Sequence, residues 1–156
     1  INKGLMGGEG ELRKVRGLLW VVMRALRKLA RTSGRLLYRG MREGVDRSTY
    51  VEGGFVVWHA LSSTSPDMKV VKEFLTTKAS GAGKERKSSG TLFIIEDGWG
   101  YNVQPYSVFP EETEILLEPE RCFKVQSVIE AETTVVKLKM VDSPLILPQY
   151  FGDGSE

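Results

Sequence analysis

Three carboxylates stand close together in the segment "SVFPEETEIL" (107–116), directly before an apolar run. Side chains alternate along an extended strand, so Glu112 and Glu114 would share one face, about 6–7 Å apart, while Glu111 would point to the other. Like charges held side by side cost stability unless a cation or ligand uses them. The segment therefore indicates either a site for a cationic group or a solvated acidic turn ahead of a strand.

Two further polar groups stand where strands are expected to end. Arg39 follows the apolar residues of "RLLYRG" (35–40), and its planar guanidinium could hold a phosphate or a carboxylate. The alternative for Arg39 is a salt bridge to a nearby acid. Ser63, Thr64 and Ser65 form a hydroxyl cluster after another strand, and its alternative is a helix cap with a turn. For Ser65 we expect the cap, with the next residue, a proline, opening the helix.

The elements that would position these residues follow from the hydrophobic pattern. The spacing predicts an amphipathic helix over 11–31 and a short helix over 66–75, with a loop over 76–90 and a turn-rich connection over 97–107. Strands are expected at 35–40, 54–61, 91–96, 113–119, 122–131 and 133–141, the last three antiparallel. An N-terminal helical layer followed by a strand-rich body is typical of an α+β domain. We expect one domain over 1–148, helical in 1–35, and a tail or linker over 149–156.

Length and charge limit the number of domains and the kind of ligand to expect. The 156 residues suit one domain, and the start at Ile1 suggests a piece of a longer chain. Residues 1–47 hold 12 Lys and Arg against 4 Asp and Glu, a local +8, and the rest of the chain is −6. This asymmetry suits either an anionic ligand or a solvated helix face, and the overall pI of about 8.7 is below the range typical of nucleic-acid binders.

The sequence gives no support for a membrane span, a phosphate-binding loop, an internal disulfide or a metal site. The apolar run at 17–23 is too short to span a membrane, and "GAGK" (81–84) lacks the remaining residues of a phosphate-binding loop. Cys122 is the only cysteine, so no disulfide can form within the chain. Neither Cys122 nor His59, the only histidine, has metal-ligand spacing, and both are expected in the core or at a strand edge.

Taken in order, three segments resemble the signature motifs of the mono-ADP-ribosyltransferases of the Arg–Ser–Glu class. They are "LLYRG" (36–40), "ALSSTS" (60–65) and "YSVFPEETEILLEPERCFKV" (106–125), with "GTLFII" (90–95) before the last. The class includes cholera-type and clostridial-type toxins and the vertebrate arginine-specific ecto-enzymes. The resemblance implies the ADP-ribosyltransferase fold, in which N-terminal helices precede a mixed or antiparallel two-sheet core.

The resemblance also implies roles for single residues. Arg39 would hold NAD through its phosphate and ribose, with the Gly40 backbone at the nicotinamide amide. Ser63 would position Glu114, and Glu114 would stabilise the oxocarbenium-like charge that develops as nicotinamide departs. Glu112 would engage the guanidinium of an acceptor arginine.

Two aromatic residues have weaker counterparts in the family. Phe74 would stack on nicotinamide, or else belong to the core side of the 66–75 helix. Phe109 would face the target protein, or else pack beneath the turn. The family often has an aromatic residue at the place of Leu61, so the chain departs from the pattern there.

The resemblance implies an enzyme that transfers ADP-ribose from NAD to an arginine of a target protein and releases nicotinamide. NAD would be the co-substrate, and no metal, nucleic acid or membrane segment is expected. An NAD glycohydrolase using the same site and an inactive interaction domain remain as alternatives. The lack of disulfides favours cytoplasmic or toxin-like members delivered into a host cytosol over the disulfide-bonded extracellular ones.

Overall fold

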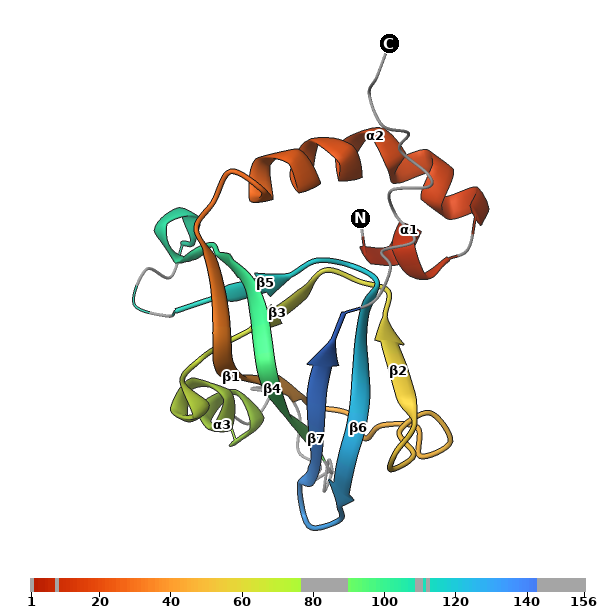
Figure 1. The fold of residues 1–156 in the computed structure, drawn as a ribbon, viewed down its shortest axis with the longest axis vertical. Coiled ribbons are helices and arrows are strands. Elements are labelled where there is room, and N and C mark those ends of the chain that lie inside the picture. Colours follow the sequence, from red (N-terminus) through yellow and green to blue (C-terminus); the bar gives the residue numbers. More distant parts are fainter. Residues whose placement is uncertain (1, 8, 77–89, 109–110, 112, 143–156) are drawn as a thin grey trace, which may run out of the picture.

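A computed structural model describes residues 2–7, 9–76, 90–108, 111 and 113–142 (Figure 1). Two helices open the chain, and strands make up most of the remainder. In chain order the elements are α1 (Asn2–Met6), α2 (Glu9–Leu26), β1 (Arg31–Met41), β2 (Phe55–Trp58), β3 (Ser62–Thr64), α3 (Met68–Thr76), β4 (Thr91–Asn102), the 3-10 turn η1 (Gln104–Tyr106), β5 (Ile115–Leu117), β6 (Arg121–Ile129) and β7 (Thr134–Val141).

The seven strands form one hydrogen-bonded, mixed sheet. Its order is β2-β6-β7-β4-β5-β3, and β1 pairs with β4 outside this path. The first half of β4 pairs in parallel with β7, whereas its end, at Tyr101 and Asn102, pairs with β5. A bridge between Tyr38 and Ser65 connects β3 back to β1. Strands β1, β4, β5 and β3 therefore form a closed circuit, which brings the ends of distant segments together.

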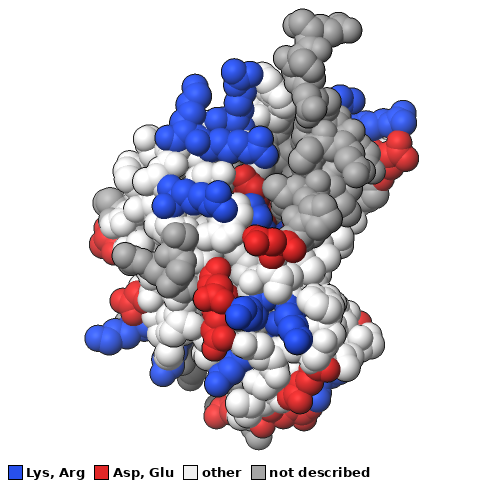
Figure 2. Space-filling view, viewed as in Figure 1, with Lys and Arg blue, Asp and Glu red and all other residues white. Residues whose placement is uncertain are grey.

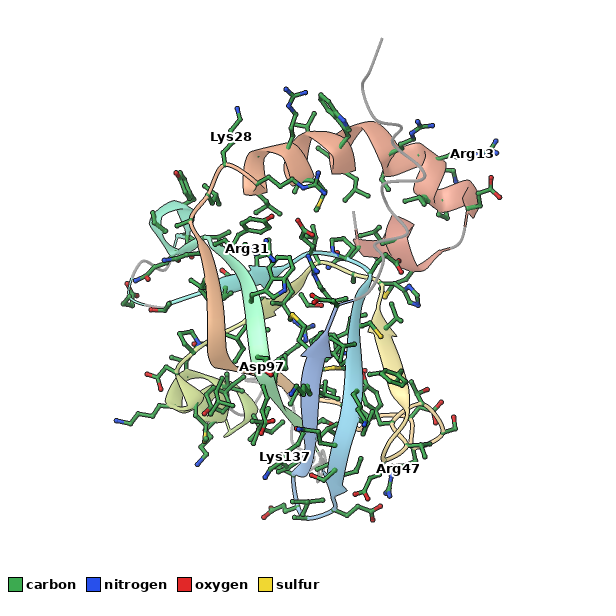
Figure 3. The ribbon with its side chains drawn as sticks, in the orientation of Figure 1. Arg13, Lys28, Arg31, Arg47, Asp97 and Lys137 are labelled. Carbon is green, nitrogen blue, oxygen red and sulfur yellow. The ribbon has the colours of Figure 1, made fainter. Side chains whose placement is uncertain are left out.

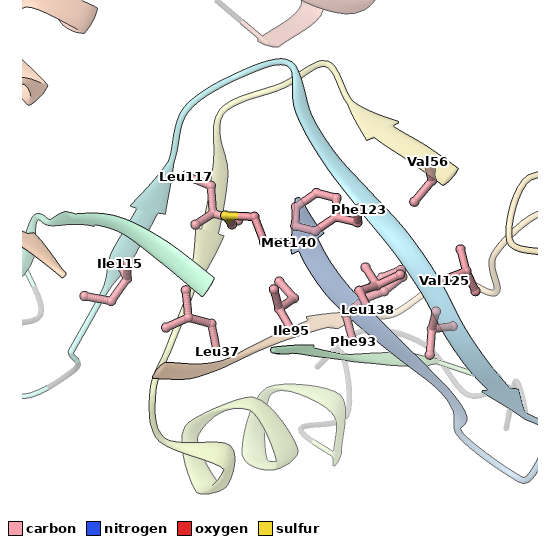
Figure 4. Close-up of a cluster of buried hydrophobic side chains, with 11 residues drawn as sticks. Leu37, Val56, Phe93, Ile95, Ile115, Leu117, Phe123, Val125, Leu138 and Met140 are labelled. Carbon is pink, nitrogen blue, oxygen red and sulfur yellow. The ribbon is translucent and has the colours of Figure 1, made fainter. Parts of the chain in front are cut away.

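The main core fills the space between the strands (Figure 4). Its side chains alternate with outward-facing ones, as on β7, where Val136, Leu138 and Met140 point inward. Eleven buried residues make up this core: Leu37, Val56, Phe93, Ile95, Ile115, Leu117, Phe123, Val125, Val136, Leu138 and Met140.

Helix α2 crosses one end of the sheet (Figure 1). Its buried face consists of Leu19, Met23 and Leu26, which form a second cluster with Tyr101 of β4. Glu9 and Glu11 in its first turn complement the helix dipole. The α+β class and the N-terminal helical layer with a mixed sheet are confirmed.

The first helix ends earlier than the periodicity indicates. The pattern predicts a helix to residue 31, but α2 stops at Leu26 and β1 already begins at Arg31. Arg31 and Thr32 pair with Tyr101 and Gly100 of β4, and this pairing outweighs the local helical pattern. The helical part of the chain thus ends before residue 35.

The expected cap of the second helix is wrong by two residues. Helix α3 begins at Met68, and the Asp67 carboxylate accepts the Lys69 N–H at 2.8 Å. Asp67 is therefore the cap. The Ser65 hydroxyl accepts the N–H of Asp67 at 3.1 Å, and its backbone is engaged by Tyr38.

The expected turn-rich connection after residue 96 is also wrong, because β4 continues to Asn102. Asp97, Gly98 and Gly100 are typical of turns, yet here they pair or pass close to neighbouring strands. A Cβ on Gly100 would lie 2.7 Å from the carbonyl oxygen of Leu116, so the glycine permits β4 and β5 to approach.

The three C-terminal strands are present, at 115–117, 121–129 and 134–141, but they do not form one antiparallel set. β6 and β7 pair with each other, whereas β5 pairs with β3 and β4. The predicted loop at 76–90 falls almost wholly outside the described residues, and the tail at 149–156 lies entirely outside them.

The charge asymmetry of the sequence persists in space. Figure 2 shows Lys and Arg side chains gathered over α2, whereas acidic and basic side chains are mixed over the middle and the opposite end of this face. Arg13 and Lys28 project outward at the two ends of the helix region (Figure 3). Among the described residues, no helix is long and apolar enough to cross a membrane.

Candidate active site

Arg39 lies near the end of β1, opposite Phe93 of β4. Its Nη1 donates to the carbonyl oxygen of Ser63 at 2.8 Å. Burial lowers the pKa of Arg39, against a smaller opposite effect of Tyr50. No carboxylate of the described residues pairs with this guanidinium. A partly desolvated cation without an anion is costly, and it is a suitable partner for a bound phosphate.

Ser63 is the exposed member of β3, whose neighbours Ser62 and Thr64 are buried. The strand is held on both sides. Thr64 donates its hydroxyl to the Ile115 carbonyl at 2.7 Å, and Ser65 exchanges backbone hydrogen bonds with Tyr38 at 2.8 and 2.9 Å. The Ser63 hydroxyl is thus presented to solvent from a fixed backbone.

Glu114 directly precedes β5 and is half-buried. Its carbonyl accepts the N–H of Val103 at 3.0 Å, which fixes the backbone at this point. Ser63 pairs with Leu116, so Glu114, two residues earlier, is its diagonal neighbour on the same face. Diagonal neighbours stand roughly 7–8 Å apart, close enough for both side chains to contact one ligand.

The fold therefore brings three of the predicted site residues into neighbouring positions. Arg39 contacts the backbone of Ser63, and Glu114 lies at the start of the strand paired with β3. Gly40 follows Arg39 in β1 and pairs with Leu92. Their roles in binding NAD stay predictions.

The structure describes only some of the other predicted site residues. Glu112 and Phe109 lie outside the described residues. Phe74 belongs to α3, which contacts β1, but its side chain is not among those described. Glu111 is exposed.

Two aromatic residues beside Arg39 were missed by sequence reasoning. The Trp58 ring centroid lies 5.7 Å from the guanidinium carbon of Arg39, and Trp58 Nε1 donates to the Tyr50 hydroxyl at 3.0 Å. Both rings pack against Phe93. No local motif signals this contact, because it depends on the pairing of Arg39 with Phe93.

A buried charged cluster at the far end of β5 was also missed. Glu118 accepts hydrogen bonds from Tyr101 at 2.9 Å and from Arg121 at 2.5 Å, and Arg27 of the α2 end lies 3.6 Å away. The guanidinium of Arg121 also stacks on Trp99, 3.6 Å from the ring centroid. The cluster ties the end of β5 to β4, β6 and α2.

A second arginine, Arg31, also stacks on the Trp99 ring. The guanidinium carbon of Arg31 lies 3.4 Å from the ring centroid, at the start of β1 (Figure 3). Two guanidinium groups cannot share one ring face at such distances, so Trp99 stands between Arg31 and Arg121.

His59 and Cys122 take structural positions. His59 is exposed just after β2, with Nδ1 2.9 Å from Glu120, and Cys122 is half-buried in β6. Within the described part of the chain, no group of three or more His, Cys, Asp or Glu could hold a metal ion.

The sequence model of the family described as NAD:arginine ADP-ribosyltransferase matches residues 13–143. The chain belongs to this family. The match includes β1, β3 and β5, the three strands that carry Arg39, Ser63 and Glu114 or adjoin them. The family predicted from the three motifs is therefore confirmed.

Solved ADP-ribosyltransferases share the fold at low identity. The Vis toxin of Vibrio splendidus is 23% identical over 91% of this chain, with a TM-score of 0.68. Its structure in complex with agmatine is matched at 24% identity, with a TM-score of 0.67, over 91% of this chain and 67% of that one. Exoenzyme S of Pseudomonas aeruginosa, in complex with human 14-3-3 protein beta and bound to carba-NAD, is 19% identical over 98% of this chain and 75% of that one, with a TM-score of 0.62.

The chain spans 66% of the length of the Vis toxin chain in the first of these comparisons. A comparison with curated protein sequences gave no match.

Proposed function

We propose that this chain transfers ADP-ribose from NAD to the guanidinium of an arginine on a target protein. The observation that carries the proposal is the half-buried Arg39, which has no carboxylate partner in the described residues and is fixed to Ser63, on the strand next to Glu114. The family match and the fold support it. Agmatine, bound by the Vis toxin, carries the same guanidinium group as an arginine side chain.

In the proposed reaction, Arg39 binds the NAD phosphates and Ser63 orients Glu114. The bond between the ribose C1′ and the nicotinamide nitrogen breaks, and its electron pair leaves with nicotinamide. The Glu114 carboxylate stabilises the positive charge that develops on the ribose. Because this charge is largest in the transition state, the stabilisation accelerates the step.

The second half of the reaction uses the acceptor. A guanidinium nitrogen of the target arginine attacks C1′ and loses a proton, so the products are ADP-ribosyl-arginine, nicotinamide and one proton. Glu112 would hold the guanidinium and receive this proton. Water in place of the guanidinium would give NAD hydrolysis at the same site.

The domain boundaries belong to the same proposal. We assign residues 1–148 to a single catalytic domain and 149–156 to a tail. Helix α2 supports this unit, because Leu19 and Met23 pack in one cluster with Tyr101 of β4.

Three variants in one acidic segment test these roles. With labelled NAD and agmatine as acceptor, Glu114→Ala should lower both nicotinamide release and transfer by about 10²–10³-fold, the usual cost of removing a transition-state stabiliser. Glu112→Ala should lose transfer and keep some nicotinamide release. Glu111→Ala, an exposed neighbour, is the matched control and should keep both activities. Undiminished NAD cleavage in Glu114→Ala would refute the mechanism.

A further inference from the structure

Tyr50 and Trp58 form a hydrogen-bonded pair next to Arg39. Their oxygen and nitrogen lie 3.0 Å apart, and the two ring centroids lie 5.4 and 5.1 Å from that of Phe93. Phe93 is the cross-strand partner of Arg39, and directly paired residues share one face of a sheet. The phenol of Tyr50 therefore lies on the side of the sheet that carries the Arg39 side chain.

The hydrogen bonds of this pair leave one donor free. An indole N–H can only donate, so the Tyr50 oxygen acts as the acceptor toward Trp58. The phenol still has its own O–H, and none of the described residues accepts it. Tyr50 is half-buried, and its ring packs on Phe93.

Protonation keeps the donor available. Burial raises the pKa of Tyr50, and the smaller effects of Trp58 and of the Arg39 charge act in the opposite direction. The phenol is thus neutral at physiological pH. The Trp58 ring centroid lies 5.7 Å from the guanidinium carbon of Arg39, so the indole that donates to the Tyr50 oxygen is itself a neighbour of Arg39.

We propose that Tyr50 donates its O–H to the phosphate group that Arg39 binds, so that the two residues together form the pyrophosphate site. This inference rests on the proposed function, since it assumes NAD as the ligand. A neutral donor suits this position, because it strengthens the binding of an anion without adding a second desolvated charge. The Trp58 N–H occupies the phenol oxygen as acceptor and leaves the Tyr50 O–H for the phosphate.

Two single variants separate binding from packing. Tyr50→Phe keeps the ring on Phe93 and removes the O–H, whereas Trp58→Phe removes the N–H and leaves the Tyr50 O–H in place. Tyr50→Phe should weaken binding of ADP-ribose, measured by calorimetry, roughly tenfold or more, as expected for a hydrogen bond to a charged group. Trp58→Phe should change it by less than about threefold, while both variants lower the melting temperature.

Nicotinamide riboside, which lacks the pyrophosphate, is the matched ligand. Its affinity should be unchanged in Tyr50→Phe. Tyr50→Phe leaves the Trp58 N–H without its acceptor, which lowers the stability of the fold. If this single variant does not fold, the double variant Tyr50→Phe/Trp58→Phe removes both hydrogen-bonding partners and must show the same loss of ADP-ribose affinity. Unchanged ADP-ribose affinity in Tyr50→Phe or in the double variant, or an equal loss for nicotinamide riboside, overturns the inference.

The variant Arg39→Ala shows whether only the role of Tyr50 is wrong or the proposed function is wrong as well. If Arg39→Ala loses ADP-ribose affinity and Tyr50→Phe does not, only the role of Tyr50 is wrong. If the unaltered chain binds neither ADP-ribose nor NAD, both the role of Tyr50 and the proposed function are wrong.

Discussion

Replacing Glu118 by alanine should destabilise the fold by about 3–5 kcal/mol, the usual cost of removing one partner of a buried ion pair. The side chains of Glu118 and Arg121 are only 3% and 6% exposed, so Arg121 would be left as an uncompensated buried charge. Its Nε already lacks a hydrogen-bond partner in the described residues. Tyr101 would also lose the acceptor of its hydroxyl. Such a loss is a large share of the 5–15 kcal/mol that typical domains possess.

The effect can be measured by thermal unfolding followed by circular dichroism. A domain of this size shifts by about 2–4 °C per kcal/mol, so the melting temperature should fall by about 6–20 °C. Glu118→Gln retains an acceptor for Tyr101 but not the charge facing Arg121, and should cost about 2 kcal/mol. Glu132→Ala, at an exposed turn position, is the control and should stay within about 0.5 kcal/mol. Equal melting temperatures for Glu118→Ala and Glu132→Ala would refute this reasoning.

Three other changes have defined outcomes. Gly100→Ala places a Cβ 2.7 Å from the Leu116 carbonyl oxygen, so it should cost about 1–3 kcal/mol and also reduce nicotinamide release, because β5 must shift. Leu19→Ala should cost about 2–5 kcal/mol in urea unfolding, while Leu18→Ala, 57% exposed on the same helix, should cost little; similar costs would contradict the packing of α2. Burial and a neighbouring carboxylate raise the pKa of Tyr101 above 10.0, so its contribution to stability is complete below pH 10 and is lost as the pH rises through the folded-state pKa. Urea unfolding measured at increasing pH should show this decline only above about pH 10, and Tyr101→Phe should reduce it.

Local patterns predicted most elements but not their ends. The apolar spacing predicted α2 correctly but placed its end too late, at residue 31. The chain becomes a strand at Arg31 because Arg31 pairs with Tyr101 of β4, and this pairing is not visible in the local sequence. β4 was cut short for the same reason. Asp97 and Gly98 favour a turn by composition. Asp97 does have a left-handed backbone, with φ 53°, but Gly98 pairs with Arg35 of β1, far away in the sequence, and the strand continues to Asn102.

The candidate site divides in the same way. Arg39, Ser63 and Glu114 were predicted because each stands in a motif of its own, and the order of the motifs identifies the family. Tyr50 carries no such signal. Its place beside Arg39 depends on the fold of the segment between β1 and β2, and on packing against Phe93.

The buried state of Glu118 is equally hidden in the sequence. Its spacing of three residues from Arg121 is visible, but such spacing is common between exposed charges. The pair is buried by contacts that depend on the fold: Tyr101 and Trp99 of β4 contact Glu118 and Arg121, and Arg27 after α2 lies 3.6 Å from Glu118.

The most direct test of the account is a single reaction of the folded chain with NAD labelled in its adenylate part and agmatine as acceptor. We expect labelled agmatine to accumulate together with an equal amount of free nicotinamide. Nicotinamide release without labelled agmatine would identify a glycohydrolase instead. A folded chain that binds NAD and leaves it intact would contradict the proposed activity.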